Sequence, residues 1–190
     1  MLKLYVLLLL SAFTPSAFAA VGCDLNEPDR DVARLFPQST GYKTAYLSLK
    51  PGGQAQLERV EKRLGDSFKG LYENIEVPYT VYSIYRGKEL EGYIHGVNQK
   101  GEYGGIQVFL ALDPAGEIKA FYIRKLTSRA AKDLRSREFG AQFEGLALRD
   151  FENYVPSVPK SAPAKLAAPA KAGKDFQAVL RAVKKNLVLM

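Results

Sequence analysis

Few residues in this chain have side chains suited to catalysis by themselves. The 190 residues include one cysteine, Cys23, and one histidine, His95, and no ligand spacing typical of a metal site is present. A Cys–His nucleophilic pair is formally possible, but Cys23 follows an apolar N-terminal segment and His95 stands alone in a predicted strand, where a structural role is commoner. Residues 101–105, G-E-Y-G-G, lie in a hairpin context and do not predict a phosphate-binding loop. The sequence shows no independent catalytic machinery.

The first 22 residues have the features of a signal peptide. Lys3 supplies the positive charge, Leu4 to Leu10 form the apolar core, and Ala17-Phe18-Ala19 has the small-x-small pattern of a cleavage site. The apolar run is short for a membrane span, and Pro15 interrupts it. We therefore expect residues 1–22 to be removed and the protein to be exported.

Cys23 stands where export signals of bacterial lipoproteins place their acylated cysteine. Ala20-Val21-Gly22-Cys23 resembles a lipobox, although the commonest form has Leu in place of Ala20. A lone thiol in an exported chain has no intramolecular disulfide partner, and lipidation would explain it. Asp24 resembles the signal that retains lipoproteins on the inner membrane, so we expect a periplasmic protein anchored there by Cys23. The alternative is ordinary signal-peptidase cleavage and a free thiol near the mature N-terminus.

The stretch from Thr80 to Arg124 predicts four consecutive antiparallel strands. It contains four short runs rich in Val, Ile, Tyr and Phe, separated by turns at residues 87–89, 98–103 and 113–116. In the last run, alternation places Ile118 on one face with Ala120 and Tyr122. The alternation is imperfect, which predicts cover on part of the second face as well.

Helices on both sides of this stretch can cover the sheet. Residues 23–78 predict a helix near Pro28 capped by Asn26, a strand within 39–49, and a helix over 54–64 ended by Gly65. After the strands, Thr127 or Ser128 opens a further helix. The core, residues 79–155, closes with the apolar residues between Phe139 and Phe151. The predicted fold class is α+β, an antiparallel sheet of about four or five strands covered by helices.

The C-terminal part of the chain divides into a linker and a helix. Residues 156–172 are rich in Pro, Ala and Lys and predict an extended or disordered linker. Residues 173–190 predict a helix that folds back on the domain through one apolar face, formed by Phe176, Val179, Leu180, Val183 and Leu187. Its opposite face is basic, which makes contact with a membrane surface a weaker alternative; this face is formed by Lys174, Arg181, Lys184 and Lys185.

The net charge is positive but dispersed. The chain has a formal charge of +7 and a pI near 9.4, and loss of Lys3 with the signal peptide leaves +7 − 1 = +6. Basic and aromatic residues do not combine into an RNA-binding motif, so no nucleic-acid partner is expected. A basic surface also suits anionic lipid headgroups.

Several motifs resemble the FMN-binding domain found in subunits of sodium-translocating NADH:quinone reductase and Rnf-type electron-transport complexes. They occur in the family's order and span roughly residues 79–187: Gly92-Tyr93, Tyr103-Gly104-Gly105-Ile106-Gln107-Val108, Ala111-Leu112-Asp113, Gly116-Glu117-Ile118, Thr127 at the E-T-P position, and Gln142-Phe143-Glu144-Gly145 as the Q-F-x-G segment. The resemblance implies a flavin cofactor, electron transfer, and a membrane-bound redox complex or cytochrome as partner.

The chain departs from this family at the attachment point of the flavin. Family members carry FMN on the threonine of an S-G-A-T motif, whereas residues 170–175 here are A-K-A-G-K-D, and no Ser or Thr follows Ser161. A phosphoester bond at that position is chemically excluded, so any FMN would be held without a covalent link. We expect its phosphate at the N-terminus of the helix opened by Thr127-Ser128, with Arg129 adding a charge-assisted contact.

The flavin ring would also need aromatic or apolar walls. Candidates are Tyr93, Tyr103 beside Gly104 of the glycine motif, and Phe121. Two functions follow from the resemblance: an FMN-binding electron carrier at the outer face of the inner membrane, or a flavin-free accessory or scaffold lipoprotein of an envelope complex. The missing threonine favours the second, and the resemblance itself favours the first.

The lipidation of Cys23 is directly testable. Replacing Cys23→Ser is expected to move the mature protein from the membrane to the soluble periplasmic fraction, because the thioether-linked lipid is the expected anchor. Metabolic labelling with palmitate should be lost at the same time. Wild-type protein that is already soluble and unlabelled would rule lipidation out.

Overall fold

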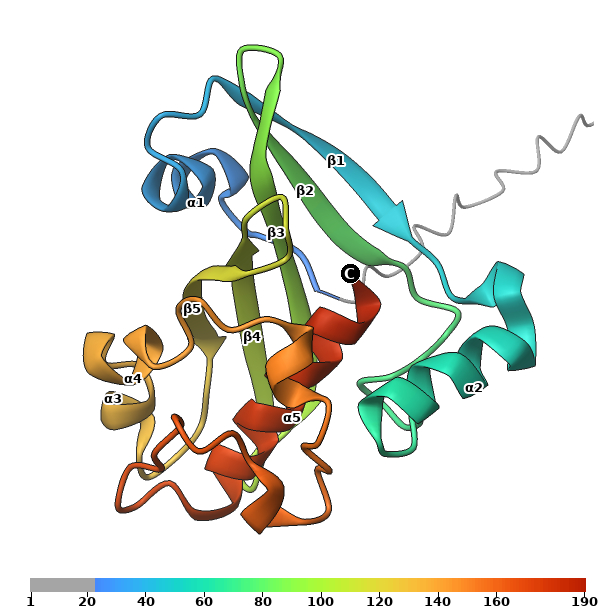
Figure 1. The fold of residues 1–190 in the computed structure, drawn as a ribbon, viewed down its shortest axis with the longest axis vertical. Coiled ribbons are helices and arrows are strands. Elements are labelled where there is room, and N and C mark those ends of the chain that lie inside the picture. Colours follow the sequence, from blue (N-terminus) through green and yellow to red (C-terminus); the bar gives the residue numbers. More distant parts are fainter. Residues whose placement is uncertain (1–22) are drawn as a thin grey trace, which may run out of the picture.

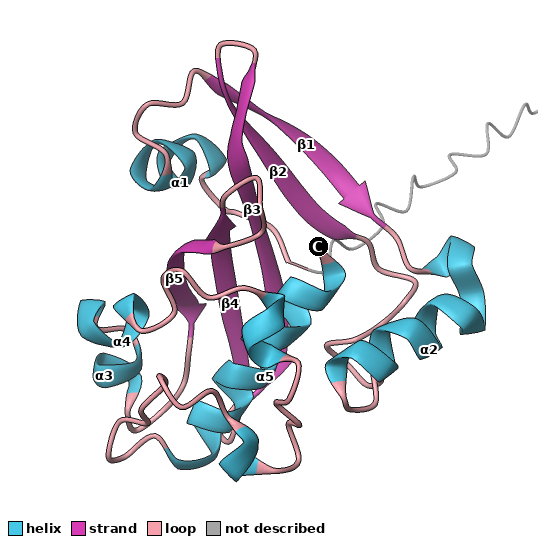
Figure 2. Cartoon of the chain, viewed as in Figure 1, coloured by secondary structure: helices cyan, strands magenta, loops and turns pink. Residues whose placement is uncertain are grey.

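A computed structural model describes residues 23–190, so the predicted signal peptide lies outside the described residues. Five strands form one antiparallel sheet in sequential order: β1 (Gly41–Leu47), β2 (Tyr79–Arg86), β3 (Glu89–Lys100), β4 (Gly105–Leu112) and β5 (Ile118–Lys125) (Figures 1 and 2). The four strands predicted from residue 80 onward and the earlier strand within 39–49 are confirmed, and with them the α+β class.

The C-terminal helix is the main cover of one face of the sheet. This helix, α5 (Gly173–Leu189), lies across β3 and β4 and is flanked by α2 (Gly53–Leu64) (Figure 1). The predicted return of the helix onto the domain is confirmed, because its five predicted apolar residues are all buried in the larger hydrophobic cluster.

The alternative prediction, that the basic face of α5 contacts a membrane surface, is wrong. Lys184 and Lys185 are buried, and the Lys184 ammonium donates to the carbonyl of Tyr154. The Arg181 side chain is only 12% exposed. Three of the four residues of this basic face therefore point into the protein, and only Lys174 is exposed.

The opposite face of the sheet carries a second, smaller cluster. It consists of the segment before α1 (Pro28–Leu35), that helix and the inner strands: Cys23, Leu25, Val32, Phe36, Tyr82, Ile84, Ile94, Phe109 and Ala111. Gly96 is required here, because a Cβ at this position would lie 2.4 Å from the Phe109 ring. Cover on both faces explains why the strands alternate imperfectly.

A β-bulge in β5 changes which residues share a face. Ala111 pairs with Ala120, but Leu112 pairs with Ile118, so Lys119 is the extra residue. Ile118 therefore joins the α5 side of the sheet, while Ala120 packs on the other. The prediction that Ile118 shares a face with Ala120 is wrong, because simple alternation does not anticipate a bulge.

Helix ends follow the predictions in part. Gly65 ends α2 in the left-handed conformation, with φ at 72°, as predicted. Glu27, not Asn26, occupies the N-cap of α1, and no side chain caps it. Pro28 in the first position and the acids Asp29 and Asp31 in the first turn suit this helix start instead.

The segment between β5 and α5 is folded but has little regular structure. It contains α3 (Ala131–Leu134), α4 (Arg137–Ala141) and two 3₁₀ turns, η2 (Leu148–Phe151) and η3 (Pro159–Ser161). The expectation of an extended or disordered linker at 156–172 is wrong, because Leu166 and Ala172 are buried in the larger cluster. The Ala167 N–H also donates to Gln142 Oε1 at 2.7 Å. Within residues 23–190, no helix has the length and apolarity to cross a membrane.

The packing of α5 yields a stability prediction. Leu180, on the buried face of α5, is 0% exposed, so Leu180→Ala is expected to lower the free energy of unfolding by about 2–5 kcal/mol, the usual effect of a buried large-to-small change. Leu71→Ala is a matched control, because Leu71 is 86% exposed. Equal denaturation midpoints for the two variants would mean that α5 does not pack as described.

Candidate functional site

Four of the predicted FMN contacts lie together at one end of the sheet. Gly104, in the turn between β3 and β4, faces the loop after β5, and a Cβ built on Gly104 would lie 4.0 Å from Thr127 Oγ1. The Arg129 guanidinium lies over the ring of Tyr103, 5.5 Å from its centroid. Thr127, Arg129 and Tyr103 are all exposed. We call Tyr103, Gly104, Thr127 and Arg129 the hairpin corner.

The helix expected to open at Thr127-Ser128 is reduced to a single turn that begins later in the chain. Ser128 Oγ accepts a hydrogen bond from the N–H of Ala130 at 3.2 Å, which stabilises a turn, and α3 begins only at Ala131 and lasts four residues. A helix of one turn has no appreciable macrodipole. The prediction that this helix N-terminus grips a phosphate is therefore wrong, and Ser128 serves the turn.

Tyr93 lies too far along β3 to share a site with Tyr103. It pairs with Leu112, whereas Lys100 at the other end of β3 pairs with Gly105. The seven steps from Tyr93 to Lys100 correspond to about 23 Å of extended strand. Tyr93 instead lines a separate apolar groove, described below, and the prediction that it walls the same flavin is wrong.

Phe121 is also unavailable as a wall of the hairpin corner. Its ring stacks on Phe143 with centroids 4.3 Å apart and meets Phe139 edge-on. These aromatic rings belong to the larger core cluster, as the sequence predicted for Phe139 and Phe143.

The N-terminus of α5 adjoins the hairpin corner, and a carboxylate of the protein, Asp175, already occupies this helix end. Asp175, in the first turn of α5, accepts a hydrogen bond from the N–H of Glu102 at 2.8 Å and is 1% exposed. A carboxylate in this position already complements the positive end of the helix. A second anion placed there would meet its negative charge.

A cavity of about 580 Å³ lies beside the hairpin corner. It is lined by residues of the 66–73 loop, of the 99–104 turn and of α5: Asp66, Ser67, Lys69, Gly70, Leu71, Tyr72, Glu73, Gln99, Lys100, Gly101, Glu102, Gly104 and Arg181. The volume falls within the range typical of small-molecule sites. The cavity is mixed in charge, because both acidic and basic side chains line it.

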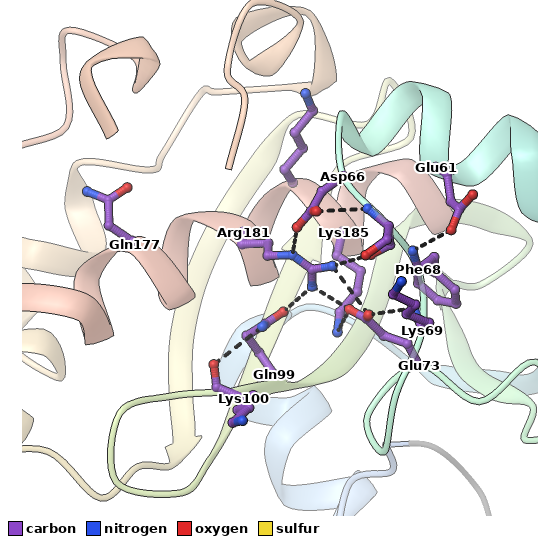
Figure 3. Close-up of polar contacts among 12 residues, drawn as sticks. Glu61, Asp66, Phe68, Lys69, Glu73, Gln99, Lys100, Gln177, Arg181 and Lys185 are labelled. Atoms are coloured by element: carbon purple, nitrogen blue, oxygen red, sulfur yellow. Dashed lines mark hydrogen bonds and ion pairs between the residues drawn. The ribbon is translucent and has the colours of Figure 1, made fainter. Parts of the chain in front are cut away.

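Arg181 at the floor of this cavity is saturated by the protein. Its Nε donates to Asp66 Oδ2 at 2.7 Å, and one terminal nitrogen donates to Glu73 and to Gln99 Oε1, the latter at 2.7 Å (Figure 3). The other donates to the Ser67 carbonyl at 2.8 Å and to Glu73 Oε2 at 3.3 Å. All five N–H groups of the guanidinium are thus used. Arg181 cannot bind a ligand without breaking one of these bonds.

Lys185 completes the cluster around Glu73. Its ammonium lies 3.1 Å from Glu73 Oε1 and also donates to the Asn98 carbonyl. Burial would raise the pKa of Glu73, but the Arg181 hydrogen bond and the Lys185 charge outweigh it and hold that pKa below its ordinary value. Burial lowers the pKa of Lys185 to about 8 against the pull of Glu73. We call these residues the Arg181 cluster; it consists of Asp66, Glu73, Gln99, Arg181 and Lys185. The cluster holds segments of the fold together, and no local sequence motif predicted it.

His95 is enclosed beneath α5, where no ligand could reach its ring. It is fully buried, and its Nδ1 lies 2.7 Å from Asn186 Oδ1, while the Asn186 amide donates to the His95 carbonyl at 3.0 Å. Burial lowers the pKa of His95 to about 4. The imidazole is therefore neutral at pH 7, with a proton on Nδ1.

Cys23, the predicted lipidation site, has its side chain buried in the smaller cluster. It is 2% exposed, and burial raises the pKa of its thiol to about 12, against a hydrogen bond from Gln107. A thiol in this state is a poor nucleophile. A lipid on the Cys23 sulfur would have to leave this cluster, so lipidation, which stays a prediction, implies that the N-terminal segment swings outward.

A second hollow of about 600 Å³ forms an apolar groove on the α5 side of the sheet. Strand residues, the β4–β5 turn, residues 147–149 and the end of α5 line it: Ala45, Leu47, Val81, Tyr93, Leu112, Pro114, Ala115, Gly116, Ala147, Leu148, Arg149, Leu187 and Met190. Arg149 is its only basic residue and is paired with Glu117. In residues 23–190, no group of three or more His, Cys, Asp or Glu side chains is arranged to hold a metal ion.

Comparison with known proteins adds no assignment. No protein-family model matches the chain, and no curated protein sequence matches it significantly. The resemblance to FMN-binding domains therefore rests on the motifs quoted above and stays a prediction.

The buried His95 predicts a pH dependence of stability. Its folded pKa of about 4 lies below the ordinary value of 6.5, so the unfolded chain takes up a proton first as the pH falls, and stability is lost through this window. Between pH 7 and pH 5 the loss is about 2 kcal/mol. Denaturant titrations of His95→Gln should show a nearly flat profile over the same range, whatever the variant's absolute stability. An equal slope in both proteins would show that His95 does not titrate in this way.

Proposed function

We propose that the protein is an exported flavin-binding electron carrier that holds FMN without a covalent bond at the hairpin corner. The observation that carries the proposal is that Thr127 and Arg129 are exposed and lack polar partners within the described part of the protein. Both are exposed, and among residues 23–190 the Thr127 hydroxyl has no hydrogen-bond partner and Arg129 no ion pair. Unlike Arg181, whose N–H groups are all used within the protein, these two groups are free to bind an anion.

The residues at the hairpin corner suit the parts of FMN in different ways. Arg129 and the Thr127 hydroxyl offer a cation and a hydrogen-bond donor to the phosphate. Gly104 leaves its backbone accessible, because a Cβ there would meet nothing closer than 4.0 Å. Tyr103 is 44% exposed and presents an aromatic face for stacking. The adjoining cavity of about 580 Å³ offers room for a ring system.

Bound flavin would supply one- and two-electron redox chemistry, and the protein would bind and orient it. The proposed place is the periplasmic side of the inner membrane, with Cys23 as lipid anchor. A membrane-bound redox complex or a cytochrome is the proposed electron partner.

A second candidate function is that of a flavin-free accessory or scaffold lipoprotein in an envelope complex. Asp175 supports it, because its carboxylate occupies the turn at the start of α5 where the S-G-A-T flavin of the resembled family would be attached. The absence of any hydroxyl side chain after Ser161 supports it as well.

The visible spectrum and a flavin titration separate these functions. An electron carrier should show flavin absorption near about 450 nm after purification or reconstitution with FMN, and acid precipitation should release all of the flavin and leave a peptide of unmodified mass. FMN should bind more tightly than riboflavin, which lacks the phosphate. Binding of neither compound at high micromolar concentration would leave the accessory function.

Arg129 provides the sharpest mutational test of the hairpin corner. Arg129→Ala should weaken FMN binding about fivefold, or about 1 kcal/mol, because the contact is charge-assisted but solvent-exposed. Riboflavin binding should change little. Arg30→Ala on α1 is a matched control, because it removes the same charge from a side chain that is 71% exposed on the other face of the sheet. Equal losses in both variants would reduce the role of Arg129 to net charge.

A further inference from the structure

The two edges of the sheet differ in how many of their outward backbone groups are hydrogen-bonded by other parts of the protein. At the β5 edge, the Ile118 N–H donates to the Leu146 carbonyl, and the Ile118 carbonyl accepts from the Gly145 N–H, each at 2.8 Å. The Arg135 guanidinium also donates to the carbonyls of Ile123 and Arg124. At the β1 edge, no residue from 23 to 190 makes a comparable bond to the outward backbone groups. Six of the seven β1 residues are exposed. An open edge strand is a template for pairing with another strand.

The sequence of β1 is nearly symmetric about its centre. It contains Tyr42-Lys43-Thr44-Ala45-Tyr46, with an aromatic ring two positions to either side of Thr44. We propose that two copies of this chain associate through β1, antiparallel and centred on Thr44, to form one continuous sheet with five strands from each copy. A two-fold axis perpendicular to the sheet relates the copies and keeps equivalent faces together.

On one face this register forms two aromatic pairs. Tyr46, which is 60% exposed, stands opposite Tyr42 of the second copy. Tyr42 already packs edge-on against Tyr82, with ring centroids 5.8 Å apart. The pairing thus extends an existing aromatic row across the interface and covers an exposed ring. Aromatic cross-strand pairs are among the more stabilising contacts in antiparallel sheets.

On the other face the register keeps the single charge of β1 out of conflict. Lys43 stands opposite the small Ala45 of the second copy, and the two lysines are diagonal neighbours at about 7–8 Å. Moving the centre by one residue to Lys43 would bring two ammonium groups directly opposite each other. Lys43 therefore disfavours a register centred on itself, and the tyrosine pairs favour the one centred on Thr44.

The expected dimer is weak, because the pairing strands are short. β1 has seven residues, and contacts of this size are typical of small, transient interfaces. Sedimentation of the mature chain over a range from about 10 µM to about 1 mM should therefore show a monomer–dimer equilibrium. A monomer over the whole range would overturn the proposal.

Three variants test the register itself. Ala45→Lys places a lysine opposite Lys43 at both symmetry-related positions and should raise the dimer Kd about tenfold. Lys43→Glu alone should change the Kd little, because glutamate then faces Ala45. The double variant K43E/A45K creates two opposite-charge pairs and should restore dimerisation. Failure of A45K to weaken the dimer, or of the double variant to recover it, would place the contact elsewhere.

Two controls keep these results interpretable. Lys43 and Ala45 are exposed in β1, so thermal unfolding of the dilute monomer should be similar in all variants. Leu71→Ser removes an exposed apolar side chain away from β1 and should leave the Kd unchanged. A larger effect of L71S than of A45K would mean that self-association uses the 66–73 loop instead and would overturn the β1 proposal.

Discussion

The structure depends on one constraint: α5 is packed into the core although it carries charged side chains, and its buried charges must find partners. Asp175 bonds the turn between β3 and β4, Arg181 bonds the 66–73 loop, and Asn186 bonds the β3 backbone. Each bond ties α5 to a different segment of the chain. A buried charge left without its partner costs more than the pair itself contributes to stability, so these contacts specify where the loops around α5 must lie.

This constraint also decides which charges are left for ligands. Arg181 lines the cavity of about 580 Å³ and Lys185 lies behind it against Glu73, but the protein uses both cations internally. Arg129 and Thr127 lie outside this network, in the loop after β5 and beside the β3–β4 turn that Asp175 bonds through Glu102. The proposed phosphate contacts are therefore solvent-exposed, which implies modest affinity for FMN and easy exchange compared with the covalent attachment in the family that the motifs resemble.

The N-terminal segment links the fold to the proposed location. Cys23 is buried under the sheet, and the neighbouring Leu25 N–H donates to the Tyr82 hydroxyl at 3.2 Å. Release of this segment for lipidation would remove Cys23 and its neighbour Leu25 from the smaller cluster and expose part of it. Membrane attachment at Cys23 and complete burial of that cluster therefore exclude each other, because both depend on where the segment with Cys23 and Leu25 lies.

Local patterns in the sequence determined the elements of this fold, and the tertiary structure decided what their polar faces do. Strand alternation, the turns at 87–89 and 113–116 and the glycine after α2 act over a few residues, so they could be predicted. The helix after Thr127-Ser128 was predicted to start too early and to be too long, because local Ser hydrogen bonds favour a turn as readily as a cap. Tyr93 and Tyr103 were both candidate walls of one flavin, but Tyr93 lies within β3 and Tyr103 in the turn after its far end. Arg181 and Asp66 are 115 residues apart, and the sequence pattern of α5 is the same whether its charges face water or buried carboxylates. Only the folded chain brings the partners together and settles that difference.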